Sequence, residues 1–218
     1  IAGVEGNGQS ELVQAITGLR RPVKGEIWLR DRNVAGLGPR ELYALGLSHI
    51  PEDKSKFGLA MNFDLAENSL LGRQWEPQFA GTLGRLNWNN ILNFADYIVR
   101  AFNVVAPGLR TPVKSLSGGN QQKLLVGREL SKEPSLVVAA HPTRGLDIAS
   151  TVYIRELLIK MRDAGKAVLL VSADLDEVLE LSDRIAVMYE GEFLGEGKIG
   201  EFTREEIGMM MGGVRLTK

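Results

Sequence analysis

Short apolar runs alternate with helix-forming segments in the second half of the chain, and this alternation constrains the fold most strongly. Leu136–Ala140 and Ala167–Val171 have the length and composition of buried strands. Between them, residues 152–161 carry apolar side chains at the i, i+3, i+4, i+7 spacing of an amphipathic helix. Strands that alternate with helices in this way pair in parallel, so the pattern predicts an α/β core built on a parallel sheet.

The other segments extend this pattern and add a region of different texture. Residues 1–4 are predicted to be the tail of a buried strand, and residues 11–17 a helix. Between 54 and 110, strand patterns vanish and aromatic residues stand among helix formers, with the clearest helix at 90–102. Thr203 and Glu206 form a capping box that predicts a last helix. Further strands are predicted at 25–29, 46–50 and 184–188, the last followed by a hairpin turn at 190–192, and further helices at 39–44 and 174–181.

A serine and two glycines precede a helix-forming run in the middle of the chain. Ser117, Gly118 and Gly119 stand at the expected helix start, where backbone N–H groups have no partner within the helix and the helix dipole is positive. A serine hydroxyl beside such a terminus makes a site for an anion, most simply a phosphate. These three residues alone favour an ordinary helix cap. The whole stretch at 116–123, Leu-Ser-Gly-Gly-Asn-Gln-Gln-Lys, favours the anion site, because specificity rises with motif length.

This eight-residue stretch resembles the signature motif of ABC-transporter ATPases, in the form found in importers of sugars and nucleosides. The resemblance extends from Ile1 to about Met211. It implies a P-loop NTPase-like α/β fold, an ABC-type ATPase core with a parallel sheet and a helical insertion, and N-terminal strands that are truncated. It also implies a RecA-like core with a small β subdomain at 1–53 and 111–218, and a helical subdomain at 54–110 that the signature helix from 116 adjoins.

Residues 3–10 have the spacing of a phosphate-binding P-loop with one departure. Gln9 occupies the position of the P-loop lysine, so no side-chain charge is offered to the phosphates. Glu5 and Glu11 add carboxylates that compete with a phosphate for the same amides. The motif alone fits both a weakened nucleotide loop and a strand–turn–helix in which the glycines serve geometry only. The residues assigned to the degenerate loop are Gly3, Gly6, Asn7, Gly8, Gln9 and Ser10.

Four other positions depart from the family pattern. Glu52 stands at the glutamine of the Q-loop, and Ala140 stands at the magnesium-binding aspartate that ends the Walker B strand. His141 replaces the catalytic glutamate, and Ala173 replaces the switch histidine. His141 could in principle act as a base, but the metal that would orient its water lacks a ligand at Ala140. We therefore predict no metal site formed by this chain.

The signature and the D-loop keep the family pattern. In ABC ATPases two domains meet head to tail, and each nucleotide lies between the P-loop of one domain and the signature of the other. The resemblance assigns Ser117, Gly118, Gly119 and Asn120 to a partner's ATP site, and Asp147 to the D-loop at the dimer interface. Losses confined to one face of the domain suggest a division of labour, in which this chain completes its partner's site while its own site is silent.

Within the family, the chain resembles the C-terminal ATPase half of the ATP-binding subunits of sugar and nucleoside importers. Asn7-Gly8-Gln9 and Ser172-Ala173-Asp174 place it nearer the nucleoside branch, although the solute itself stays open. The resemblance implies ATP and Mg²⁺ as cofactors, held mainly by the partner domain. The expected partners are a second ATPase half upstream of Ile1, transmembrane permease subunits and, indirectly, a solute-binding protein. The expected place is the cytoplasmic face of the cell membrane, as a peripheral component.

Two other functions stay open, namely a self-sufficient P-loop ATPase that uses Gln9 and His141, and a scaffold that docks to the membrane subunit without nucleotide.

The composition of the chain argues against several other classes of function. The net charge of −1 gives no global field that attracts nucleic acid, and the absence of cysteine excludes thiolate chemistry. The longest apolar runs have five residues, too few to span a bilayer. We expect the chain to be a fragment of a longer polypeptide without a signal peptide.

Overall fold

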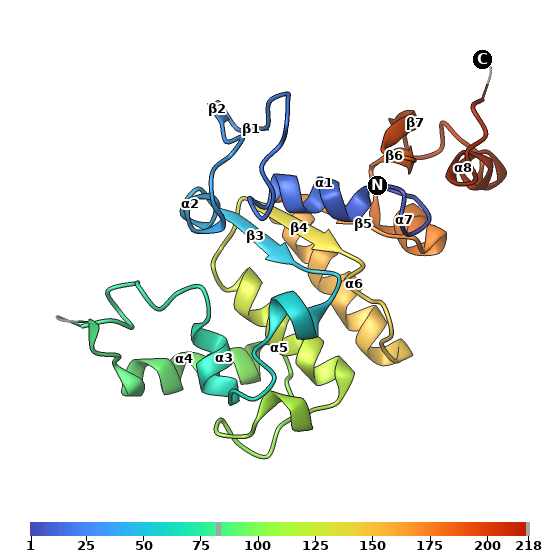
Figure 1. Ribbon diagram of the computed structural model, residues 1–218. Helices are drawn as coiled ribbons and strands as arrows, with labels where there is room; N and C mark the ends of the chain where they lie inside the picture. The colour runs from blue at the N-terminus through green and yellow to red at the C-terminus, as the bar shows by residue number, and fades with distance from the viewer. Residues whose placement is uncertain (82–83, 217–218) are drawn as a thin grey trace. The chain divides into compact units, whose positions relative to one another are not determined.

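The computed structural model describes residues 1–81 and 84–216 and divides into two compact units (Figure 1). The core unit comprises Ile1–His49, Ser135–His141 and Leu158–Lys218. The helical unit comprises Ile50–Pro134 and Pro142–Leu157. The predicted insertion at 54–110 lies wholly in the helical unit, which is larger because the signature helix packs among its helices.

The core unit holds the strands and most of the flanking helices. Its elements are α1 (Gln9–Ile16), β1 (Trp28–Leu29), β2 (Arg32–Asn33), α2 (Pro39–Ala44), β3 (Leu47–Ile50), β4 (Leu136–Ala140), β5 (Ala167–Val171), α7 (Leu175–Leu181), β6 (Arg184–Tyr189), β7 (Glu192–Lys198) and α8 (Arg204–Met211). The helix α6 (Ile148–Asp163) begins in the helical unit and ends in the core unit, and the last residue of β3, Ile50, belongs to the helical unit.

The predicted parallel sheet is confirmed. Strands β3, β4 and β5 are hydrogen-bonded in that order, and β4 pairs with β5 in parallel from Leu136↔Ala167 to Ala140↔Val171. Four of the five β4 residues are buried, as expected for a central parallel strand covered on both faces. Helix α1 packs against β4 (Figure 1).

The first two residues extend this parallel arrangement. Ala2 is fully buried and bridges Ser172 on one side and Val187 on the other, both in parallel. The Ser172 N–H donates to the Ile1 carbonyl at 3.0 Å, and the Ala2 N–H donates to the Ala186 carbonyl at 2.9 Å. The prediction that residues 1–4 end a buried strand is thus confirmed at Ala2, whereas Val4 is already exposed.

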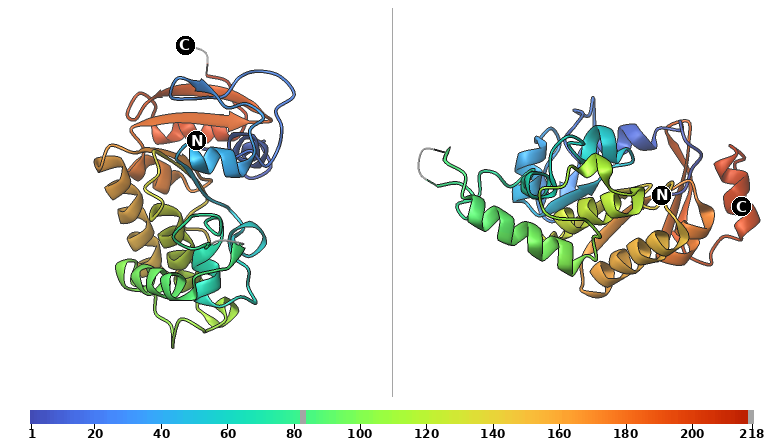
Figure 2. Two further views of the ribbon diagram at one scale, coloured as in Figure 1. Left: turned by 90° about the vertical axis from the view of Figure 1, so that its left-hand side faces the viewer. Right: turned by 90° about the horizontal axis from the view of Figure 1, so that it is seen from below.

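The end of the core unit is an antiparallel hairpin with a helix beside it. Strands β6 and β7 pair through a bulge between Val187 and Met188, and α8 packs against β6 (Figure 2). The Thr203–Glu206 capping box predicted for α8 is present, with both reciprocal hydrogen bonds. The capped helix places Ile207 and Met210 in an apolar cluster with Ile185 and Val187.

The helical unit is organised around the signature helix. Its elements are η1 (Lys54–Gly58, a single wide helical turn), α3 (Leu65–Leu70), α4 (Trp88–Ala101), η3 (Val113–Ser115) and α5 (Gly118–Leu130). Helix α5 packs against α3, α4 and η1. The predicted helix at 90–102 corresponds to α4, which begins earlier because Asn87 caps it.

Helix α5 is closely surrounded, and glycine permits two of its contacts. A Cβ at Gly127 would lie 2.8 Å from the Phe102 ring, and a Cβ at Gly58 would lie 2.9 Å from Leu125 Cδ2. These glycines let the α5 backbone approach the end of α4 and let η1 approach α5. In the described part of the chain, no helix combines the length and the hydropathy needed to cross a bilayer.

Candidate functional site

The glycine loop of the core unit has the backbone shape of a phosphate loop. Gly6 and Gly8 adopt φ angles of 91° and 100°, which side-chain-bearing residues rarely adopt. Gly8 is the N-cap of α1, so the loop ends directly on a helix N-terminus. The predicted strand–loop–helix arrangement is present, with α1 beginning at Gln9 rather than at Glu11.

Neutral side chains hold this loop to its own backbone. Gln9 is 4% exposed, and its Nε2 donates to the Val4 carbonyl at 2.8 Å. The Asn7 Nδ2 donates to the same carbonyl at 2.9 Å, while the Asn7 Oδ1 accepts from the Glu190 N–H at 2.9 Å. A Cβ at Gly3 would overlap the Gln9 amide, so glycine is needed there. The side chain at the lysine position therefore braces the loop and adds no positive charge.

The ends of β4 and β5 carry few side chains that could bind a ligand or act in catalysis. Ala140 and His141 are 4% and 9% exposed, and the His141 N–H donates to the Val171 carbonyl at 2.8 Å. Ala173 lies between Ser172, whose hydroxyl donates to Glu177 Oε2 at 2.6 Å, and Asp174, which caps α7. The Ser172–Glu177 pair is fully inside the core unit and was not predicted, since nothing in the sequence singles out its partners.

A magnesium ion does not fit the residues at these strand ends. The Ala140 methyl has no lone pair, and Mg²⁺ takes oxygen ligands in proteins. Within residues 1–81 and 84–216, no group of three His, Asp or Glu side chains is placed to hold a metal ion. A metal-dependent step therefore has no support from the core unit's own side chains.

The helical unit carries the signature at the start of α5. Ser117 is the N-cap, and its Oγ accepts from Asn120 N at 3.4 Å and from Asn120 Nδ2 at 3.0 Å. Ser117 and Gly118 are exposed. Because the Ser117 oxygen acts as the acceptor in both contacts, its own proton is available to an incoming anion.

Asn120 also fixes the neighbouring loop. Its Oδ1 accepts from the Val105 N–H at 2.8 Å, so one amide joins the cap serine to the segment after α4. Asn120 was assigned to the signature from its position, and this bracing contact was not predicted. The side chain has thus a structural task, which is to hold Ser117 and the loop in place.

The D-loop lies against the second signature glycine. Asp147 Oδ1 accepts from the Ser150 N–H and Oδ2 from the Ser150 hydroxyl, each at 2.8 Å. These two hydrogen bonds lower the pKa of Asp147 below its usual value, and the bond from the Ser150 N–H has the larger effect. A Cβ at Gly119 would overlap the Ser150 hydroxyl and lie 3.0 Å from Asp147 Oδ2.

Two more contacts join the D-loop segment to the rest of the helical unit. The Gln122 Nε2 donates to the Pro142 carbonyl at 2.8 Å in a buried environment. Glu52, at the Q-loop position, pairs with Arg144 at 2.9 Å. Sequence reasoning singled out Glu52 but did not predict its pairing with Arg144, because the two residues are far apart in the sequence.

The two signature glycines should respond differently to substitution by alanine. Gly119→Ala should lower the free energy of unfolding by about 1–3 kcal/mol, the usual cost of overpacking, because its Cβ has no room beside Ser150. Gly118→Ala is the matched control, since a Cβ there meets nothing within 4 Å. Urea unfolding of both variants measures the difference. Equal stability of the two would mean that the D-loop does not press on Gly119.

Comparisons with known proteins indicate the family of this chain. A family model described as ABC transporter matches residues 1–144. The guanosine import ATP-binding protein of Bacillus subtilis is 43% identical over 98% of this chain, and the nucleoside import ATP-binding protein of Lactococcus lactis is 40% identical over 98%. The chain spans 42% of the length of each of these two relatives.

Solved structures agree on the fold. A nucleotide-free ATP-binding cassette from an ABC transporter superposes with a TM-score of 0.73 at 22% identity, covering 97% of this chain and 82% of that one. An ATP-binding cassette bound to ADP and Pi gives 0.75 at 23% identity, covering 92% and 84%. Since the family model matches well over half of the 218 residues and the strand–loop–helix and signature elements are present, this chain belongs to the ABC transporter family of ATP-binding domains.

Proposed function

We propose that this chain is an ATP-binding domain of an importer for nucleosides or sugars. Its own nucleotide loop is silent, and its signature at Ser117–Asn120 completes the ATP site of a partner domain. The observation that carries the proposal is the contrast between the two anion sites. The chain's own nucleotide site lacks the lysine charge at Gln9 and the metal ligand at Ala140, whereas the signature keeps an exposed cap serine on an intact helix N-terminus.

The silent loop is supported by how Gln9 is used. Its buried amide is bonded to the Val4 carbonyl, so the group at the lysine position is committed to the loop itself. Glu5 and Glu11 are exposed at the loop and in the first turn of α1, where they repel a phosphate. Backbone amides at a helix start still attract an anion, so we expect weak nucleotide binding rather than none.

The signature is suited to the triphosphate held by another domain. The Ser117 hydroxyl and the amides at the start of α5 are fixed donors, oriented by Asn120 and by the packing of Gly119 on the D-loop. Donors held in place before the reaction stabilise charge that develops on a phosphoryl group during transfer. The bound Mg²⁺·ATP supplies the reacting phosphate and the metal charge, and it is held mainly by the partner.

The named relatives support the proposed partners and class of solute. They are import ATP-binding proteins for guanosine, for nucleosides and, at 40% identity in Haloferax volcanii, for glucose. Because this chain spans 42% of the first two, we propose a second ATPase half in the same polypeptide. We further propose permease subunits that the helical segment at 54–110 contacts, a solute-binding protein that acts indirectly, and a peripheral position on the cytoplasmic face of the membrane.

Two other functions are distinguished by simple measurements. A self-sufficient ATPase using His141 would hydrolyse ATP without a partner, although the 9% exposure of His141 and the methyl of Ala140 argue against it. A nucleotide-independent scaffold would associate with its partner half equally well with and without ATP.

The 218-residue chain alone should bind ATP weakly and turn it over negligibly. Charge-assisted hydrogen bonds are worth about 1.5–3 kcal/mol each. Loss of the lysine and of the metal aspartate therefore costs roughly two to four decades in affinity. Calorimetry should give no submicromolar magnesium-ATP binding. Turnover by the purified chain that disappears in His141→Ala would refute the division of labour.

In the full subunit with its membrane partners, blocking the signature should stop ATP hydrolysis. Gly118→Arg places its side chain in open space before the α5 N-terminus, and Ser117→Arg fills the same region. Removing fixed donors to a developing oxyanion costs about 10²–10³-fold in turnover. Gln9→Ala should lower ATP hydrolysis only slightly, because Gln9 belongs to a site without metal or base. The rate of hydrolysis should then depend on ATP concentration as expected for a single class of sites.

The matched control is Gly208→Arg, which adds the same side chain to another exposed helical glycine with nothing within 4 Å of its Cβ. It should retain normal hydrolysis. If Gln9→Ala damages hydrolysis as much as Gly118→Arg does, the loop at residues 3–10 is not silent and the assignment of roles is wrong.

A further inference from the structure

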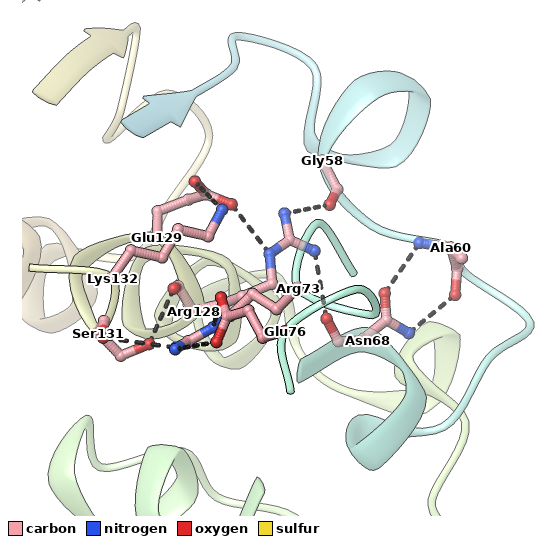
Figure 3. A network of polar contacts seen from close by, with 9 residues as sticks. All are labelled: Gly58, Ala60, Asn68, Arg73, Glu76, Arg128, Glu129, Ser131 and Lys132. Carbon is pink, nitrogen blue, oxygen red and sulfur yellow. Dashed lines mark hydrogen bonds and ion pairs between the residues drawn. The ribbon is translucent and has the colours of Figure 1, made fainter. Parts of the chain in front are cut away.

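A buried guanidinium connects the far end of the signature helix to two other segments of the helical unit. Arg128 is 5% exposed and donates in three directions (Figure 3). Its Nη2 reaches the Gly58 carbonyl at 2.8 Å, at the end of η1, and its Nη1 reaches the Asn68 carbonyl at 3.3 Å, in α3. Its Nε pairs with Glu129 at 3.0 Å.

Asn68 holds the segment between these two contacts from the other side. Its Oδ1 accepts from the Ala60 N–H at 2.9 Å, and its Nδ2 donates to the Ala60 carbonyl at 3.0 Å (Figure 3). The same Nδ2 also donates to the Phe63 carbonyl at 3.2 Å. Asn68 is fully buried. The connecting segment, residues 58–64, is therefore held through its backbone polar groups, by Arg128 at one end and Asn68 beyond it.

The charged side chains next to Arg128 are held in ion pairs. Glu129 is 1% exposed and is shared by Arg128 and by Lys132, whose Nζ lies 2.7 Å away (Figure 3). Burial alone would raise the pKa of the Glu129 carboxyl, but the two cations hold it below its ordinary value. The carboxylate is thus ionised, and it anchors the guanidinium so that the two outer nitrogens point to Gly58 and Asn68.

The segment that Arg128 holds leads back to the Q-loop position. Asp53 caps η1 by accepting from the N–H groups of Ser55 and Lys56, and Glu52 pairs with Arg144. The other end of α5 rests on the D-loop through Gly119. Helix α5 is therefore tied near both of its ends to segments that flank Glu52 and Asp147.

We propose that Arg128 is a positioning residue for the signature. By joining Gly58 and Asn68 to α5, it keeps Ser117 in register with the segment that begins at Glu52, so that a shift of that segment moves the signature. Arg128 lies about three helical turns from Ser117, or ~16 Å along the axis, so it acts only through the helix. This inference rests on the proposed role of the signature.

The fork geometry of arginine explains why lysine is no substitute. One guanidinium serves two carbonyls and a carboxylate with separate nitrogens, whereas a lysine ammonium is a single point charge. Arg128→Lys keeps the charge beside Glu129 and so keeps the buried charges paired. It should lose the bridge between η1 and α3.

Hydrogen exchange on the full two-half subunit tests the anchor directly. In Arg128→Lys, the Ala60 amide should lose about tenfold in protection, because one of the two supports of residues 58–64 is gone. Arg100→Lys is the matched control, an exposed arginine on α4 that pairs only with Asp96 among the ion pairs of the described residues. Unchanged protection at Ala60 would show that Asn68 alone holds the segment, and the proposal would fall.

Kinetics of the same subunit with its membrane partners test the consequence. Arg128→Lys should lower kcat for ATP hydrolysis about tenfold and leave the KM for ATP within about twofold, since the fixed donors are misplaced while the nucleotide is bound elsewhere. Gly58→Ala is a second variant that keeps Arg128 but pushes η1 from Leu125, and it should act in the same direction. A parallel loss of folded protein and kcat, with unchanged activity per folded molecule, would overturn the positioning role.

Failure of the proposed function is distinguishable from failure of this inference. If Gly118→Arg leaves hydrolysis intact, the signature does not act in the reaction, whatever Arg128 does. If Gly118→Arg abolishes hydrolysis while Arg128→Lys changes neither exchange nor kcat, the signature acts but Arg128 does not position it.

Discussion

The close packing around α5 is the constraint on which the rest of the helical unit depends. Its backbone meets the Ser150 hydroxyl at Gly119 and the Phe102 ring at Gly127, at distances that leave no room for a side chain. Because these contacts involve the main chain, they fix the helix itself rather than individual side chains. The direction of the Ser117 hydroxyl and of the first amides follows from that placement.

The two candidate anion sites share a backbone design and differ in what side chains add to it. Each ends on a helix N-terminus, and each uses an amide side chain as a brace, Gln9 in one and Asn120 in the other. At the glycine loop the brace occupies the position where a cation is expected. At the signature the brace leaves the serine proton available to an anion.

Regular, locally determined elements were predictable from the sequence. The bounds of β4, β5 and α2 agree with the prediction, and Thr203 caps α8 as expected. Helix α3 and the turn η1 were missed, although Asp64 and Glu67 form a capping box, because a six-residue helix has too few turns to show periodicity. Helix α6 begins at Ile148, four residues earlier than predicted, because its first exposed apolar residues break the amphipathic pattern.

The sequence by itself determined which chemistry is missing, because a residue type sets what a side chain can offer: no charge at Gln9 and no metal ligand at Ala140. Only the tertiary structure decided what the remaining groups do. Glu52 meets Arg144 across 92 residues of chain, Gly58 meets Arg128 across 70, and Val105 meets Asn120 across 15. No local pattern encodes such pairs, since each depends on how distant segments pack around α5.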